Sequence, residues 1–116
     1  ASIIGAETNL VDEMDTIASV YHNRIKKKMK LESDPTVEYV IKRPMKPKDK
    51  FIDSPYNTYQ NRTLPPSPIN SPGISAIKAA IYPAKTEFLY MVMNYKSGRH
   101  LFGKNYNEHK RNIRKK

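Results

Sequence analysis

The segment between residues 54 and 73 constrains the fold most strongly, because prolines stand at positions 55, 65, 66, 68 and 72. Each proline fixes its own φ and lacks a backbone N–H donor, so this stretch can be neither a helix nor an inner strand. It is also longer than the usual connection in a compact domain, and structured loops of such length are usually functional. We therefore expect a long structured loop that serves a site, with regular elements before and after it.

Hydrophobic spacing predicts three helices before this loop. Over residues 1–8, Ile3 and Ile4 begin an apolar stripe, and Glu7 takes the next position on that face. Residues 12–28 carry the strongest pattern, with five apolar side chains at helical spacing: Met14, Ile17, Ala18, Tyr21 and Ile25. A short helix should follow over residues 36–41, opened by Asp34 as its N-cap with Pro35 at the first helical position.

A basic loop over residues 42–50 then leads towards the proline-rich segment. Beyond that segment, residues 73–82 are expected to form a helix that ends at Pro83 and has one apolar side, made of Ile74, Ile77, Ala80 and Ile81. Residues 88–95 alternate, residues 96–98 suit a turn and residues 99–102 return, which predicts a β-hairpin. Asn105 can cap a final helix. The fold class is therefore α+β: one small helical domain with a β-hairpin and a long structured proline-rich loop.

The charge of the chain narrows the choice of partner. Its 116 residues fit one domain, and 21 Lys and Arg against 11 Asp and Glu give a formal net charge of +10. Nucleic acid, an anionic membrane surface or an anionic polymer such as a cell wall would all suit this charge. The sequence has no cysteine and no HExxH, P-loop or GxGxxG motif, so we expect neither a metal nor a cofactor. No run of 18 apolar residues predicts a membrane-spanning helix.

Seven segments together resemble the YceG-like family, and they occur in the order that the family has. They are residues 1–8 (ASIIGAET), 23–25 (NRI), 31–37 (LESDPTV), 54–59 (SPYNTY), 64–73 (LPPSPINSPG), 83–90 (PAKTEFLY) and the closing His100, Phe102 and His109. The segments at 54–59 and 64–73 are the most specific of these. The chain departs from the family pattern at Gly5, Glu32, Thr63 and Ser67.

The resemblance implies a catalytic domain over residues 1–116 with a lysozyme-like centre. It implies a lytic transglycosylase (MltG-type) that cleaves the β-1,4 bond between MurNAc and GlcNAc in peptidoglycan and leaves 1,6-anhydro-MurNAc ends. Glu7 matches the single acid of the family, which first protonates the leaving oxygen and then takes a proton from the C6 hydroxyl. A Glu on the apolar face of a short helix fits this role independently, because partial burial raises the pKa of a carboxyl.

The resemblance also assigns a set of substrate-binding residues: Asn23, Glu32, Ser33, Tyr56, Asn57, Thr58, Tyr59 and His100. Several of them have a second reading. Asn23 either orients Glu7 or bonds backbone, and Glu32 either binds sugar or is an ordinary solvated carboxylate. Residues 56–59 either line the cleft or form a self-bonded turn. Asp34 suits an N-cap better than a second acid, and a histidine on a strand is more often structural than catalytic.

Two other functions are compatible with the residues alone. One is a peptidoglycan-binding domain without activity, and the other is a basic nucleic-acid-binding module, for which no recognition motif is present. The family resemblance implies glycan strands rather than nucleic acid as the partner, and association with penicillin-binding proteins. It places the protein on the extracytoplasmic face of the bacterial inner membrane, and we expect the membrane anchor and a LysM-like domain to lie outside this sequence.

Overall fold

The computed structural model describes residues 1–115, so Lys116 at the end of the basic tail lies outside the described residues. Along the chain the elements are α1 (Ser2–Glu7), α2 (Val11–Lys26), α3 (Asp34–Ile41), the 3-10 helix η1 (Pro47–Phe51), α4 (Ile74–Ile81), β1 (Tyr90–Asn94), β2 (Arg99–Gly103) and α5 (Tyr106–Lys115). The two strands pair antiparallel, from Tyr90 opposite Gly103 to Asn94 opposite Arg99. The α+β class predicted from the sequence is therefore confirmed.

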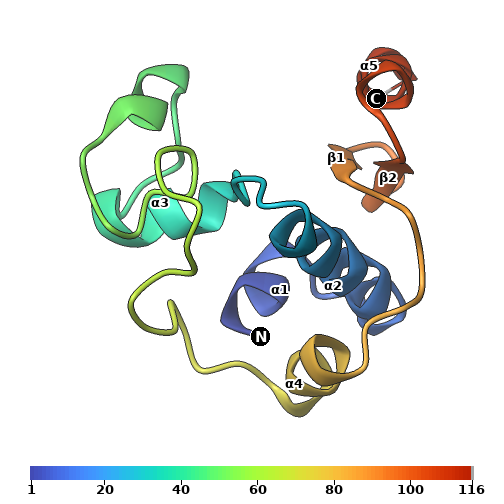
Figure 1. Cartoon of the computed structure of the whole chain (residues 1–116), viewed down its shortest axis with the longest axis horizontal. Helices are drawn as coiled ribbons and strands as arrows, with labels where there is room; N and C mark the ends of the chain where they lie inside the picture. Colours follow the sequence, from blue (N-terminus) through green and yellow to red (C-terminus); the bar gives the residue numbers. More distant parts are fainter. Residues whose placement is uncertain (116) are drawn as a thin grey trace.

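Helix α2 is the centre of the molecule (Figure 1), with α1 and α4 packed against it. Its inner side contributes Met14, Ile17, Ala18 and Tyr21 to the core, and Ile17 and Ala18 are completely buried. The expected fifth member of this stripe, Ile25, is instead 46% exposed. The core ends one turn before the helix does, so the last apolar position of the pattern faces solvent.

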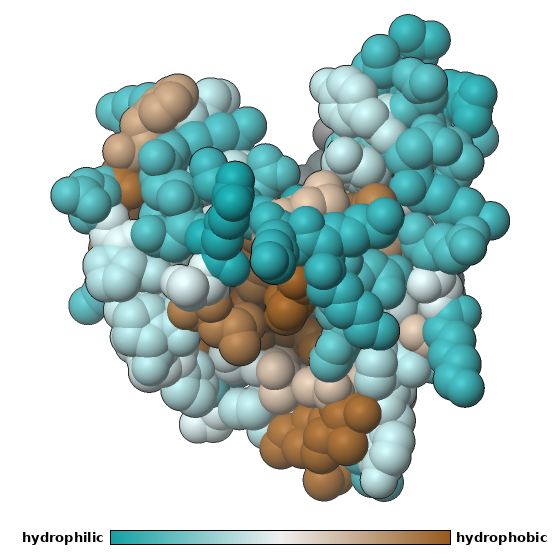
Figure 2. Space-filling model, in the orientation of Figure 1, coloured by the Kyte–Doolittle hydropathy of each residue, from teal (hydrophilic) through white to brown (hydrophobic). Residues whose placement is uncertain are grey.

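The isoleucines of α4 predict that their side of the helix faces the core. In the structure, another side of the helix faces it. Ala76 and Ala79 are buried, whereas Ile74 and Ile81 are more than half exposed. An apolar patch at the lower edge of the space-filling view lies over this helix (Figure 2). The reason is proximity, since the side chain of Ala76 lies 3.6 Å from the position that a Cβ on Gly5 of α1 would take. Only small side chains allow two helices to approach so closely.

The proline-rich segment is a structured loop, as predicted, and side-chain amides hold it in place. Asn57 donates from Nδ2 to the carbonyl oxygens of Lys50 (3.1 Å) and Ile52 (2.7 Å), and its Oδ1 accepts from the backbone N–H of Tyr59 (2.9 Å). Further along, Asn70 donates to the carbonyl of Ser2 at 3.0 Å. The loop therefore runs from η1 back to the start of α1 and is bonded at both places.

Two details before this loop differ from the sequence prediction. Residues 42–50 are not a plain loop, because η1 forms at their end, where Asp49 binds Arg43 through both carboxylate oxygens (2.8 and 2.9 Å) and accepts from the N–H of Lys46. Hydrogen bonds from Arg43 and from that backbone N–H lower the pKa of Asp49 to about 2. In α3 the N-cap is Ser33 rather than Asp34, which is the first helical residue. The C-terminal helix is as expected, since Asn105 Oδ1 caps it by accepting from the N–H of Glu108 at 2.9 Å.

The β-hairpin joins α2 mainly through polar contacts. Arg24 is buried, donates from Nε to the carbonyl of Leu89 at 2.7 Å and lies over the ring of Tyr90, 5.1 Å from its centroid. Asn23 donates to the carbonyls of Thr86 and Phe88, both at 2.9 Å. On its other side the hairpin packs against α5. These bonds fix the hairpin as a wall beside α2.

We expect Gly5→Ala to stabilise the protein by about 0.5–1 kcal/mol, because alanine restricts the unfolded chain and suits a helix better than glycine. The added Cβ would make only ordinary van der Waals contact with Ala76, at 3.6 Å. Gly98→Ala is the matched comparison. Gly98 has φ of +73°, so alanine there should cost about 1 kcal/mol or more. Urea unfolding of both variants checks this, and a destabilised Gly5→Ala variant would contradict the packing described.

Candidate active site

A cleft of about 440 Å³ lies between the α3 side of the molecule and the β-hairpin. Figure 2 shows the hollow between the two upper arms of the molecule. Its floor and walls come from α1, α2, α3, β1 and β2, together with Leu31, Glu32, Tyr59 and Tyr95. Chain segments far apart in the sequence therefore share one polar cleft, and Glu7 lies in it.

Glu7 is the last residue of α1, and its carboxyl is held by two hydroxyls. Tyr21 of α2 donates to Oε1 at 2.6 Å, and Ser33 donates to the same oxygen at 3.0 Å. Within residues 1–115 no donor reaches Oε2, which leaves that oxygen for a ligand. Burial raises the pKa of Glu7, and the two hydrogen bonds oppose part of this rise. A carboxyl with a raised pKa holds a proton closer to neutral pH, which suits a general acid.

Ser33 is itself fixed from behind by the proline-rich loop. Its backbone N–H donates to Thr58 Oγ1 at 2.8 Å, and this hydroxyl also bonds that of Thr36 at 2.9 Å. All three side chains are at least 99% buried. Thr58 therefore does not line the cleft, but it positions the residue that holds Glu7. The left-handed backbone of Glu32, with φ of +51°, forms the turn that leads into Ser33.

Three further predicted residues line the cleft: Glu32, Tyr59 and His100. Glu32 pairs with Arg24 at 3.2 Å, and its side chain is about half exposed. Tyr59 donates its hydroxyl to Asp34 Oδ1, and burial raises the pKa of this tyrosine well above its usual value. His100 is buried in the opposite wall, on β2. The cleft therefore brings Glu7, Glu32 and Tyr59 together on one side and places His100 on the other, while Ser33 holds Glu7 from behind.

The structure places Asn23, Tyr56 and Asn57 outside this cleft. The amide of Asn23 bonds backbone at residues 86 and 88, on a different face of α2. Asn57 is 1% exposed and bonds its own loop. At this residue the structure agrees with the alternative prediction of a self-bonded turn. Tyr56 packs on Tyr39, with ring centroids 5.0 Å apart, and its hydroxyl bonds Ser67. Of the SPYNTY motif, only Tyr59 lines the cleft.

The sequence reasoning missed two residues of the site. Tyr21 was counted only as a member of an apolar stripe, although a buried tyrosine hydroxyl nearly always finds a partner. Glu13 lies in the first turn of α2, where an acidic side chain is explained by the helix dipole alone. The structure buries it to 6% exposure and pairs it with His100, whose Nδ1 lies 3.1 Å from Glu13 Oε2. The position of Glu13, directly before the apolar Met14, does not predict that its side chain is buried.

Among residues 1–115 there is no group of three or more His, Asp or Glu side chains arranged to hold a metal ion. No helix within the same residues combines the length and apolar character needed to cross a lipid bilayer.

Comparisons with known proteins identify relatives of the chain. The profile described as "YceG-like family" matches residues 1–115. An "Endolytic murein transglycosylase" of Bacillus subtilis (strain 168) is 45% identical over 112 residues, which cover 94% of this chain and 31% of that protein. A protein of the same name from Streptococcus pneumoniae (strain D39) is 31% identical over 121 residues, covering 97% and 22%. The chain thus spans less than a third of the length of these relatives.

A solved structure shows the same fold. It is the crystal structure of a yceG-like protein of Listeria monocytogenes, with a TM-score of 0.88 and 46% sequence identity. The match covers 95% of this chain and 37% of that one.

Glu7→Gln should make the fold more stable at neutral pH. The folded-state pKa of Glu7 is raised above its ordinary value of 4.5, so the protonated carboxyl favours folding at low pH and this contribution is lost as pH rises through the folded-state pKa. Glutamine does not titrate, and its carbonyl oxygen can still accept from Tyr21 and Ser33. The stability difference between variant and parent should therefore grow from acid to neutral pH.

Urea unfolding at several pH values measures this difference. Glu87→Gln is the control, because its side chain is 83% exposed, and its difference from the parent should stay nearly flat. A Glu7→Gln difference that is equally flat would show that burial does not raise the Glu7 pKa.

Proposed function

The chain belongs to the YceG-like family, and from that premise we propose that it is an endolytic lytic transglycosylase of peptidoglycan. The bond cleaved would be the β-1,4 link between MurNAc and GlcNAc, and the product ends would be 1,6-anhydro-MurNAc. The observation that carries this proposal is the carboxyl of Glu7, which has a raised pKa, one oxygen held by two donors and the other free towards the cleft. The names of the curated relatives support the same activity.

In this reaction Glu7 acts twice. Protonated Glu7 donates its proton to the glycosidic oxygen as the bond from that oxygen to C1 of MurNAc breaks. The resulting carboxylate then accepts the proton of the C6 hydroxyl of the same sugar as O6 bonds to C1. Glu7 thus regains in the second step the proton that it donates in the first, and no water is consumed. A single carboxyl is therefore sufficient, in contrast to the pair required for ordinary glycoside hydrolysis.

The other carboxylates of the cleft are less suited to this role. Glu32 is paired with Arg24, Asp34 accepts the hydroxyl of Tyr59, and Glu38 accepts the backbone N–H of Met45 at 2.9 Å. Each of these three carboxylates is thus engaged by the protein, whereas Glu7 keeps one oxygen free and its burial favours the protonated form. Glu7 is therefore the acid that we propose.

The rest of the cleft suits a polar sugar chain. The exposed ring of Tyr95 and the half-buried ring of Tyr59 provide flat faces, and Glu32 and His100 provide hydrogen-bonding groups. The net charge of +10 favours a polymer whose stem peptides carry carboxylates. We propose glycan strands as the substrate on these grounds.

On family grounds we also propose that the protein acts at the extracytoplasmic face of the bacterial inner membrane, close to penicillin-binding proteins. Crosslinking in cells followed by mass spectrometry tests this. Crosslinks to cell-wall synthases are expected, and a crosslink pattern without any synthase would count against the association.

The activity itself is tested on uncrosslinked glycan strands. The parent protein should release products with anhydro-MurNAc ends, and Glu7→Gln should reduce this activity by at least about 100-fold, because it removes the only proposed proton donor. Mass spectrometry identifies the ends. Glu87→Gln makes the same chemical change at an exposed site outside the cleft and should keep the activity.

Other outcomes identify the alternatives. Reducing ends would mean hydrolysis by water, and Asp34 or Glu32 would then be the candidate second carboxylate. Strand binding without cleavage by the parent would indicate a peptidoglycan-binding domain. Salt-sensitive binding of DNA, with no effect on strands, would indicate a nucleic-acid-binding module.

A further inference from the structure

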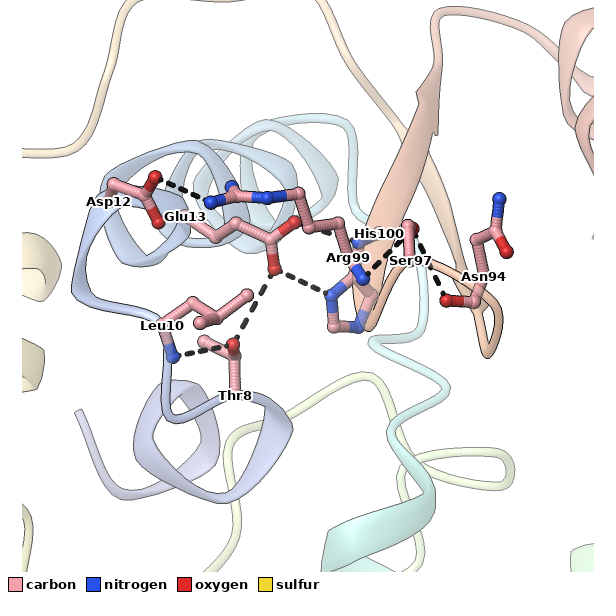
Figure 3. Close-up of polar contacts among 8 residues, drawn as sticks. All are labelled: Thr8, Leu10, Asp12, Glu13, Asn94, Ser97, Arg99 and His100. Carbon is pink, nitrogen blue, oxygen red and sulfur yellow. Dashed lines mark hydrogen bonds and ion pairs between the residues drawn. The ribbon is translucent and has the colours of Figure 1, made fainter.

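A buried carboxylate lies behind the wall of the cleft, away from Glu7. Glu13, in the first turn of α2, accepts the backbone N–H of His100 on Oε1 at 2.7 Å. Its Oε2 lies 3.1 Å from His100 Nδ1 and 3.5 Å from the hydroxyl of Thr8. Figure 3 shows the Glu13 side chain directed at the imidazole, with the exposed Asp12–Arg99 pair on the outer side. Both side chains of the Glu13–His100 pair are at most 6% exposed.

With Glu13 ionised, this geometry requires a proton on Nδ1 of His100. An ionised carboxylate has only acceptor sites, so Nδ1 must be the donor in its contact with Glu13. The other nitrogen, Nε2, makes no hydrogen bond to any of residues 1–115, although His100 lines the cleft. Buried polar atoms are rarely left without a partner, so a nitrogen at a cleft wall is expected to meet water or ligand.

The contact between Glu13 Oε2 and the imidazole of His100 is not needed to attach the hairpin to α2. The backbone of β2 is already bound through Glu13 Oε1, and the neighbouring Leu89 and Phe88 are bound by Arg24 and Asn23. Arg99 adds an ion pair with Asp12 at 3.0 Å. A carboxylate is costly to bury. We therefore expect the contact of Glu13 with the imidazole ring to do more than attach the hairpin to α2.

We propose that Glu13 is a positioning residue that holds His100 with its proton on Nδ1, so that Nε2 accepts a hydrogen bond from a hydroxyl or N-acetyl N–H of the glycan strand. This inference rests on the proposed transglycosylase function. Glu7 and His100 then contact the strand from opposite walls of the cleft. The same arrangement occurs in enzymes where a buried carboxylate fixes the tautomer of a reactive histidine.

Glu13→Gln tests the tautomer directly. The amide oxygen must still accept the backbone N–H of His100, so the amide N–H₂ faces Nδ1 and the ring proton moves to Nε2. Two-dimensional ¹⁵N NMR of the imidazole should show protonated Nδ1 in the parent and protonated Nε2 in the variant. We expect kcat/KM on glycan strands to fall at least about tenfold, the effect of one lost substrate hydrogen bond.

Asp12→Asn is the matched control. It makes the same change one residue earlier, on an exposed carboxylate that contacts Arg99 and not the ring, so tautomer and kcat/KM should not move. An unchanged tautomer in Glu13→Gln, or a ring with both nitrogens protonated in the parent at the assay pH, would overturn the proposal.

His100→Asn separates a role in the cleft from one in folding. Its side-chain N–H₂ can still donate to Glu13 in place of Nδ1, but nothing replaces Nε2. The unfolding midpoint should stay near that of the parent, while kcat/KM falls as in Glu13→Gln and the double variant loses no more than either single one. Full activity in a folded His100→Asn variant would refute the contact.

Strand contact can also be measured without cleavage. Addition of glycan strands to Glu7→Gln should shift the Nε2 resonance of His100 and leave Nδ1 nearly unchanged. If this shift occurs but the parent makes no anhydro ends, the proposed activity fails and the contact stands. If anhydro ends form and Nε2 does not shift, the activity stands and the role of His100 fails.

Discussion

Burial of the Glu7 carboxyl against Tyr21 and Ser33 is the interaction on which the cleft depends. The acid comes from the end of one helix, one donor comes from the middle of α2, and the other precedes α3. Each donor is fixed in turn: Tyr21 by the core and Ser33 by Thr58 of the proline-rich loop. A shift of any of these elements would change both the hydration and the proton affinity of the acid. Fold and chemistry therefore share the same contacts.

The proline-rich loop supports the site mostly from behind. Asn57 closes its own turn, Thr58 bonds Ser33, and only Tyr59 of this motif reaches the cleft. A motif with many amides and hydroxyls was interpreted as a sugar-binding surface, yet most of its polar groups satisfy backbone. This is the expected cost of a long loop without helix or strand, because its N–H and C=O groups need partners from side chains.

Much of the architecture could be predicted from the sequence, since helix periodicity, proline positions and the hairpin pattern are local signals. The failures share one cause. Periodicity shows which residues lie on one face of a helix but not which face meets a neighbour, so the isoleucines of α4 were placed inside and Ala76 and Ala79 were overlooked. Likewise, the contacts of Glu13 and of the Tyr21 hydroxyl are made with residues outside their own helix, which periodicity does not show. Glu7 was predicted as the acid from a family resemblance and from its apolar face, not from its partners.

The two walls of the cleft differ in the length of chain that separates the residues bonded within each wall. Ser33 and Glu7 are separated by 26 residues, whereas His100 and Glu13 are separated by 87. Loop-closure entropy grows with the logarithm of this separation, so the hairpin wall costs only about 1 kcal/mol more to close. One hydrogen bond contributes about as much. The bond from the His100 backbone to Glu13 is therefore enough to offset the added entropy, and the distant half of the cleft is nearly as easy to assemble as the near half.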